Sequence, residues 1–225
     1  MASMWRKQCS RVFGISAALA LASCASTPYF VAHDEPWRKD AEVSCLRAGA
    51  VQESAFIAGR SSLGGQDSAC GAVHPFEVSA LGNGAVGLKP TALVQCQMVP
   101  ALDAWTDSVV IPAAHAVYGM GVAQMKVLGS YSCRPMNNVP GANLSEHGHA
   151  NAVDIGGFTL TNGRTVSVLE GWNGGSAADR RFLRLVHDGA CNSFSTVLGP
   201  EANGYHRDHF HMDLMQRHAG RWICE

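Results

Sequence analysis

Two short stretches of this chain, separated by about fifty residues, hold the residues of a metal site and must meet in any fold that uses them. The first is residues 145–154 (SEHGHANAVD) and the second is residues 206–211 (HRDHFH). Together they supply histidines and a carboxylate, which are ligand types that zinc accepts. A structural zinc ion usually has four protein ligands, whereas a catalytic one has three and keeps a position for water. The residues present predict the second kind of site.

The spacing within each stretch favours two adjacent strands. His209 and His211 are two residues apart in an apolar run, and alternate side chains of a strand project to the same face. Asp154 lies in a short apolar segment that ends in two glycines, which is typical of a strand, and His147 precedes it in a glycine-containing connection. We expect one histidine of the pair to bind the metal while the other lies beside it.

Histidines also come close to one another by chance in a chain that has ten of them. A single His-x-His is more often structural than metal-binding. We interpret His115 and His187, which are isolated within helix-like stretches, as ordinary core or surface residues. The two motifs occur together and in this order, which is much rarer by accident.

The motifs resemble those of the zinc D-alanyl-D-alanine peptidases, a superfamily that includes cell-wall carboxypeptidases, vancomycin-resistance dipeptidases and the hedgehog signalling domain. Within it, the chain is most similar to the bacterial extensin-like C-terminal domain family. The resemblance covers residues 40–225 and is carried by residues 129–134, 145–147, 151–155, 190–191, 197–200 and 208–213. Ala150 stands where the superfamily usually has glycine; its methyl group is expected to crowd the turn without removing a ligand.

The resemblance implies that His147, Asp154 and His211 bind Zn²⁺ and that His209 lies beside the ion rather than on it. A zinc ion polarises the scissile carbonyl and lowers the pKa of its bound water toward ~7. Arg134 matches an arginine that steadies the polarised carbonyl in the superfamily, and its alternative role is that of a solvated or ion-paired loop residue.

Two residues are candidates for the general base. Proton transfer to such a base typically accelerates a reaction by ~10²–10⁴-fold. Asp208 matches the base of carboxypeptidase relatives and is the favoured candidate. His206 resembles a catalytic histidine of some endopeptidase relatives, and the sequence does not separate the two. Asp213 shares a strand face with His211, so we expect it to orient a histidine ligand.

These residues predict a zinc-dependent hydrolase, and the resemblance implies a D,D-carboxypeptidase or an endopeptidase that acts on the peptide bonds of peptidoglycan. A non-catalytic, zinc-stabilised module that binds the cell wall is the alternative, because a shared fold does not guarantee turnover. An amidase acting on another amide would use the same site. The motifs of serine hydrolases, penicillin-binding proteins, His-Glu-x-x-His peptidases and P-loop enzymes are absent from the sequence.

Other patterns in the chain point away from nucleotides and nucleic acids. Residues 82–87 fit Gly-x-Gly-x-x-Gly, but Pro90 follows where a dinucleotide-binding helix should already run, so a turn is predicted. No basic stripe interleaved with aromatic residues occurs, so no nucleic-acid partner is expected.

The first residues have the pattern of an export signal, with a basic start and the apolar residues 12–21. The sequence Leu-Ala-Ser-Cys resembles the bacterial lipobox, in which Cys24 is acylated; an ordinary cleaved signal is the alternative. Ala25 after it resembles lipoproteins sent to an outer membrane. We therefore predict a lipoprotein signal peptide at 1–23, a tether at 24–39 and a periplasm-facing domain at 40–225, held to the membrane by a lipid anchor.

Loss of residues 1–23 leaves 202 residues, enough for one buried domain, and moves the formal charge from −1 to −4. In an exported chain, the even set of remaining cysteines predicts three disulfides, with fifteen pairings open. The absence of Cys-x-x-Cys argues against a thiolate metal site, and the pattern carries no signal for an oligomeric state. The cysteines are Cys45, Cys70, Cys96, Cys133, Cys191 and Cys224.

The apolar periodicity predicts an α+β fold in which helices pack on a mainly antiparallel sheet. The resemblance implies a zinc site like that of hedgehog and the D,D-peptidases. Most helices are expected early in the chain and most strands late. Expected helices cover residues 42–50, 89–105, a stretch after Pro112, and a helix capped by Ser176 that runs to Ala190 with Leu185 facing inward. Expected strands cover residues 73–81, 125–133, 152–155, 165–169, 194–198 and 209–214.

Overall fold

The computed structural model describes residues 29–64, 68–217 and 220–225 of the 225-residue chain. The expected signal peptide, Cys24 and the rest of the first five residues of the expected tether (24–28) lie outside the described residues. The helices are α1 (Trp37–Arg47), α2 (Met98–Trp105), α3 (Ile111–Tyr118), α4 (Val168–Gly171) and α5 (Ala177–Ala190). The strands are β1 (Ile57–Gly59), β2 (Phe76–Leu81), β3 (Val86–Val94), β4 (Val122–Gly129), β5 (Ala152–Leu160), β6 (Thr165–Ser167), β7 (Thr196–Leu198), β8 (Phe210–Asp213) and β9 (Ile223–Cys224).

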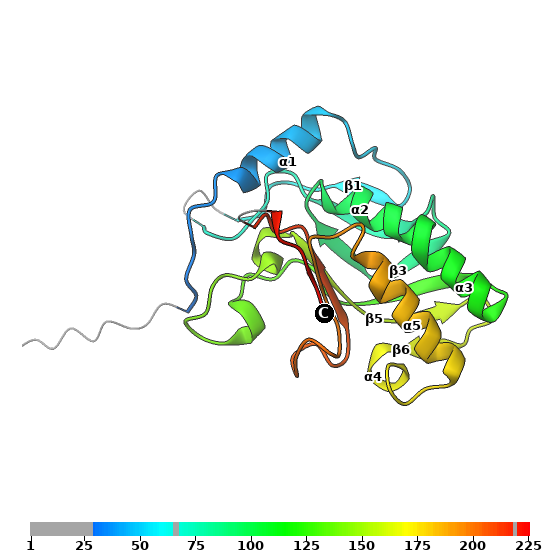
Figure 1. The fold of residues 1–225 in the computed structure, drawn as a ribbon. Coiled ribbons are helices and arrows are strands. Elements are labelled where there is room, and N and C mark those ends of the chain that lie inside the picture. The colour runs from blue at the N-terminus through cyan, green and yellow to red at the C-terminus, as the bar shows by residue number, and fades with distance from the viewer. Residues whose placement is uncertain (1–28, 65–67, 218–219) are drawn as a thin grey trace, which may run out of the picture.

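One nine-stranded sheet runs through the molecule in the order β1-β2-β3-β4-β5-β8-β7-β9, with β6 paired to β5 (Figure 1). Two pairs are parallel, β3 with β4 and β7 with β9, and the other pairs are antiparallel. A parallel pair needs a long crossover, and α2, the π-helical turn η1 (Thr106–Val110) and α3 provide it between β3 and β4. The expected mixed fold with a mainly antiparallel sheet is confirmed.

Helices cover one face of this sheet and enclose the main core. In Figure 1, α2 and α3 form one nearly continuous rod, and α5 lies beside it. Trp105 is fully buried and its indole nitrogen donates a hydrogen bond to the Val186 carbonyl of α5 over 2.9 Å. The largest fully buried side chains between helices and sheet include Trp105, Phe158, Phe182, Phe210, Leu88 and Met125.

Alternation along β5 and β8 sends the core residues to one face of the sheet and the expected ligands to the other. Val153 pairs with Met212, and these two belong to the buried apolar cluster. Asp154 pairs with His211, one step along, so their side chains point to the face opposite the helices. Both strands are buried throughout, because loops cover the second face as well.

Helix α5 forms as its sequence predicts. The Ser176 hydroxyl accepts a hydrogen bond from the Asp179 amide, and the Asp179 carboxylate accepts one from the Ser176 amide, which makes a capping box. Phe182 and Val186 are buried as expected. The inward position expected for Leu185 is wrong: 42% of this residue is exposed, because it lies on the opposite side of the helix from the buried stripe.

The helix expected from Lys89 through Trp105 is wrong in its first half. Residues 86–94 form strand β3, in which Val86 and Leu88, then Ala92 and Val94, are buried at alternate positions. Pro90 lies opposite the irregularity in the β2–β3 pairing, where a strand tolerates the missing amide hydrogen. Helix α2 begins only at Met98. Strands therefore also occur early in the chain, and the expected order of helices before strands does not hold.

The three expected disulfides are present, and the structure selects one of the fifteen pairings. Cys45 pairs with Cys96, Cys70 with Cys133 and Cys191 with Cys224. The first joins α1 to Cys96, two residues before α2, and the third ties β9 to the end of α5. The second joins the loop around Cys70 to the segment that contains Arg134.

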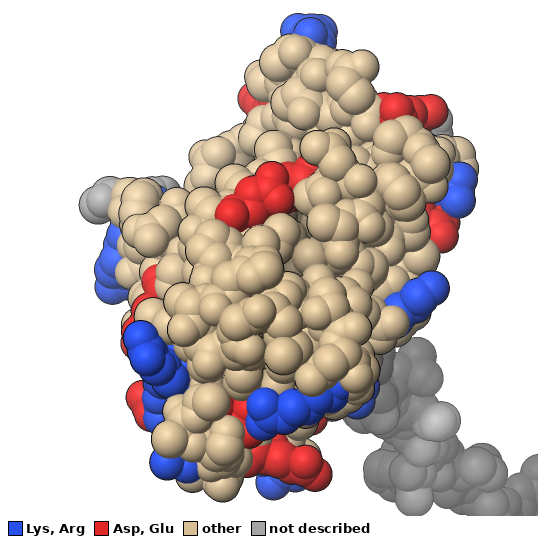
Figure 2. Space-filling model, turned by 90° about the vertical axis from the view of Figure 1, so that its right-hand side faces the viewer, with Lys and Arg blue, Asp and Glu red and all other residues tan. Residues whose placement is uncertain are grey.

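Charged side chains are interspersed on the face of the molecule that Figure 2 displays. Lysine and arginine lie mainly near its lower and outer edges, and one group of acidic side chains lies within a broad neutral area in its upper part. No single-sign stripe crosses this face. None of the described helices is both long enough and apolar enough to cross a membrane.

Replacing Cys70 and Cys133 together by alanine is expected to lower the free energy of unfolding by about 2–5 kcal/mol, because the bridge spans 63 residues and limits the unfolded chain. Chemical denaturation under non-reducing conditions measures the change. An unfolding free energy equal to that of the wild type would contradict the stabilising role of this bridge.

Candidate metal centre

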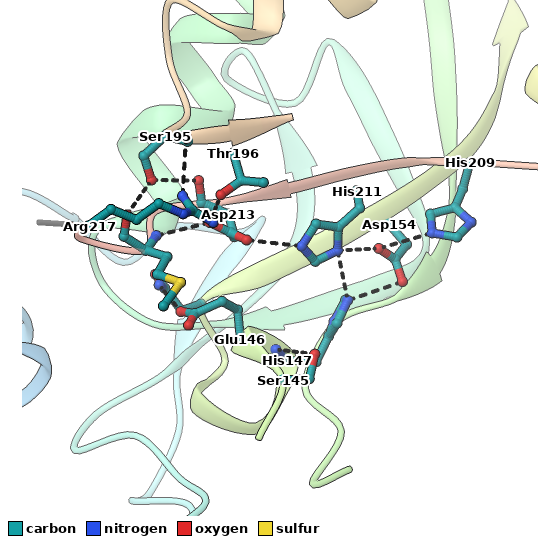
Figure 3. A network of polar contacts seen from close by, with 12 residues as sticks. Ser145, Glu146, His147, Asp154, Ser195, Thr196, His209, His211, Asp213 and Arg217 are labelled. Atoms are coloured by element: carbon teal, nitrogen blue, oxygen red, sulfur yellow. Dashed lines mark hydrogen bonds and ion pairs between the residues drawn. The ribbon is translucent and has the colours of Figure 1, made fainter. Parts of the chain in front are cut away.

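Three buried side chains bring one ligand atom each to a common point. They come from the short 3₁₀ turn η3 (Glu146–His149), from β5 and from β8: His147, Asp154 and His211. The Nε2 atom of His147 lies 3.2 Å from Asp154 Oδ2 and 3.2 Å from His211 Nδ1. The Nδ1 atom of His211 lies 3.0 Å from Asp154 Oδ1 (Figure 3).

These separations suit a small divalent cation. Zinc ligand bonds are ~2.0–2.1 Å, so two ligand atoms of a tetrahedral site lie about 3.3–3.4 Å apart. The measured separations are close to this value without any rearrangement of the backbone. Two imidazoles and a carboxylate also form the kind of ligand set found in hydrolytic zinc sites.

The outer nitrogen of each histidine has a hydrogen-bond acceptor, which fixes the direction of its ring. His147 Nδ1 lies 2.6 Å from the Ser130 carbonyl oxygen and must donate to it. His211 Nε2 donates to Asp213 over 3.0 Å, and Asp213 in turn accepts hydrogen bonds from the Thr196 hydroxyl and the Met215 amide. Such partners orient metal-binding histidines and raise their basicity.

The charges of the cluster compensate one another. Burial opposes ionisation of Asp154, but its hydrogen bonds with His147 and His211 outweigh this and lower its pKa. Burial also opposes protonation of His211, but its hydrogen bonds to Asp154 and Asp213 outweigh this and raise its pKa to about 9. The raised pKa of His211 therefore keeps a proton within the cluster at neutral pH.

Three further residues expected at the site lie close to the cluster. His209 Nε2 is 3.5 Å from Asp154 Oδ1, and its Nδ1 is 2.9 Å from Asp208. Arg134 Nη2 is 4.0 Å from Asp154 Oδ2. Asp208 therefore holds the ring of His209, and its carboxylate is partly exposed on the outer side.

His206 is held by a separate contact. Its Nδ1 lies 2.8 Å from the side-chain oxygen of Asn203, so Nδ1 donates and Nε2 keeps a free lone pair. Its ring centre is 5.7 Å from that of His211 and 5.3 Å from that of His209. Burial, followed by the nearby His211 and His209, lowers the pKa of His206 to about 4.

A cavity of about 530 Å³ opens onto the cluster. His206, His209 and Arg134 line it beside the three candidate ligands, whereas Asp208 is not among the described residues that do so. The segment before α1 forms part of the opposite wall; its Val31 backbone bonds to Ala142 and Leu144 in the loop that leads to η3.

The support behind His147 has no signature in the sequence. Arg38 of α1 donates two hydrogen bonds of 2.6 Å to Glu146, the residue before His147. Glu146 also accepts a hydrogen bond from Asn151, over 2.6 Å, and bonds to it through the backbone. Arg38 and Glu146 are 108 residues apart, so no local pattern links them. By contrast, Asn203 lies only three residues before His206, and that spacing was visible in the sequence.

Ala150 ends η3 in a left-handed conformation, with φ of 53° and no solvent exposure. Glycine adopts this conformation at lower cost than alanine. The cost of alanine at this position therefore lies in its backbone conformation. It displaces none of the candidate ligands.

The fold and the cluster define a mixed α/β protein whose mainly antiparallel sheet carries a His-Asp-His group on the face opposite its helices. The family described as Extensin-like protein C-terminus matches residues 43–225 of this sequence. The chain belongs to that family. No curated protein matches the chain significantly, and no solved structure does.

Replacing Gly129 by alanine is expected to weaken metal binding at least tenfold while the protein stays folded. Gly129 pairs with Asp154 across β4 and β5, and an added Cβ would lie 2.6 Å from Asp154 Oδ2. The carboxylate would have to turn away from the two histidines. Zinc titration by calorimetry measures the effect.

Gly87→Ala is the matched control, because its added Cβ in the neighbouring strand β3 would make only an ordinary contact of 3.6 Å. If the Gly129→Ala variant and the wild type bind zinc with equal affinity, Asp154 is not a ligand.

Uptake of a cation at pH 7.5 is expected to release about one proton per site. His211 is protonated when its pKa is about 9, and a metal ligand must give up that proton. Affinity should therefore rise with pH up to about 9. Zinc titration in buffers of different ionisation enthalpy measures the released protons. Affinity that is constant between pH 6 and 9 would contradict this linkage.

Proposed function

We propose that this protein is a zinc-dependent hydrolase of peptide bonds, and that the three convergent ligand atoms facing a cavity are the observation that carries the proposal. His147, Asp154 and His211 would hold the ion. A bound zinc ion supplies Lewis-acid polarisation of an amide carbonyl and lowers the pKa of a water molecule. The three ligands leave room for such groups on the cavity side.

The residues on the cavity wall suit proton transfer. His206 faces the cavity with an unprotonated Nε2, fixed by Asn203, and is positioned to take a proton from the attacking water. His209 presents Nε2 from the same wall, with Asp208 bound to its other nitrogen. The role of Asp208 that the geometry favours is therefore to orient His209, although the sequence alone favours it as the base.

Arg134 suits the stabilisation of a developing negative charge. Its guanidinium lines the cavity 4.0 Å from a ligand carboxylate, so it remains close to the reacting carbonyl of any substrate at the cluster. A fixed positive charge in a site that excludes most water lowers the energy of an oxyanion. Arg134 also contacts the Pro135 carbonyl, which limits the motion of its side chain.

The substrate class that we propose is peptidoglycan peptide, cleaved in the manner of a D,D-carboxypeptidase or endopeptidase. It rests on the resemblance of the two motifs to zinc D-alanyl-D-alanine peptidases. An exported lipoprotein anchored through Cys24 would meet this substrate on the periplasmic side of the envelope, and the three disulfides suit an oxidising compartment.

A non-catalytic, zinc-stabilised module that binds the cell wall is the second candidate. All three candidate ligands are buried, and they come from η3, β5 and β8. A metal ion that joins these three elements would stabilise the fold, which favours this candidate. The cavity with two histidines and an arginine on its wall favours the enzyme.

Digestion of purified muropeptides tests the proposal. The wild type with zinc is expected to release cleaved peptide, and His211→Ala is expected to lose both zinc and product. Mass spectrometry of the products and metal analysis of the protein give the two readouts. Product release by His211→Ala equal to that of the wild type would refute the assignment, whereas binding without cleavage by the wild type would favour the module.

Separate variants divide the roles on the cavity wall. His206→Gln is expected to lower kcat by about 10²–10⁴ at unchanged zinc content, as loss of a general base does. Asp208→Asn is expected to cost less, because it weakens only the orientation of His209. A larger loss in Asp208→Asn than in His206→Gln would reverse these assignments.

A further inference from the structure

A second pocket, of about 430 Å³, lies next to the metal cavity. Its walls come from the start of α1, from the residue before α2 and from the segment after β8. Met215 and Arg217 line both pockets, so the two are adjacent. Figure 3 shows how closely Arg217 follows the strand of His211 and Asp213.

Two indole side chains line this second pocket. Trp222 is 67% exposed, which is unusual for so large an apolar side chain near a disulfide-tied end of the chain. Trp37 is held in place by the guanidinium of Arg38, which lies 4.4 Å from its ring centre. Flat aromatic faces of this kind match the apolar face of a pyranose ring.

The polar groups of the pocket are amides and guanidinium groups. None of its described lining residues is acidic. Gln97 has a buried side-chain oxygen without a hydrogen-bond partner, so part of its amide is unused by the fold. Arg217 and Arg221 add positive charge. The guanidinium groups donate to hydroxyl, acetamide and carboxyl oxygens, which N-acetylated amino sugars with acidic substituents present, whereas the Gln97 oxygen is an acceptor.

We propose that the Trp37–Trp222 pocket binds the glycan of a cell-wall substrate while the attached peptide lies at the metal centre. This inference rests on the proposed function for the position of the peptide. Binding of the sugar itself requires only the pocket. The protein would then prefer peptide that is still attached to glycan over free peptide.

Calorimetric titration of the metal-free full chain with tetra-N-acetylchitotetraose tests the pocket directly. The wild type is expected to bind, and Trp222→Ala is expected to bind about tenfold more weakly, as removal of one good contact predicts. Because Trp222 is exposed, its replacement should leave the fold intact, which circular dichroism checks. Leu169→Ala is the matched control, since this residue of α4 is 57% exposed and lines neither pocket.

A second titration uses the peptide of a peptidoglycan fragment without its sugar. Loss of peptide affinity in Trp222→Ala equal to the loss of saccharide affinity would overturn the proposal, because the pocket would then accept peptide. Absence of saccharide binding by the wild type would also overturn it. With active enzyme, a KM for glycan-linked peptide that is higher in Trp222→Ala than in Leu169→Ala supports it. If the protein binds saccharide but cleaves no peptide, the proposed hydrolase activity is refuted and the glycan pocket is supported.

Discussion

The antiparallel pairing of β5 with β8 is the contact on which both the core and the candidate metal centre depend. Its register puts Asp154 opposite His211 on one face and Val153 opposite Met212 on the other. A slip of one residue would move every side chain of the strand to the wrong face. Burial of the apolar pair therefore also fixes the position of the two ligands, and the free energy of the core holds the site in place.

Buried polar groups on the second face are stable only because each has a partner. An isolated buried charge is costly, whereas a paired and hydrogen-bonded one is tolerated. Asp213 holds the outer nitrogen of His211, the Ser130 carbonyl holds that of His147, and Arg38 holds Glu146 beside it. These contacts fix the candidate ligands in advance, so the cation that we propose would bind without a large change of structure.

The stretch after β8 links the two pockets that we assign to substrate. It leaves the strand of His211, passes the shared residues Met215 and Arg217, and ends at the disulfide of Cys224. A ligand that spans both pockets would thus contact one continuous segment, whose two ends are held by strand pairing and by a covalent bond. That arrangement gives a physical reason why peptide and glycan would be recognised together.

The sequence by itself determined the features that have a local signature. The ligand types and their spacing, the capped helix α5, the even cysteine set and the mainly antiparallel sheet all follow from patterns within a few turns or strands of chain. The sequence did not determine the strand Val86–Val94, since its alternating burial is interrupted at Pro90 and competes with a helical pattern that starts nearby. Only the tertiary structure decided the disulfide pairing, the Arg38–Glu146 contact across 108 residues and the meeting of Trp37 with Trp222 at one pocket. Such contacts depend on how distant segments pack. The apolar pattern of one segment does not identify the distant segment that it contacts.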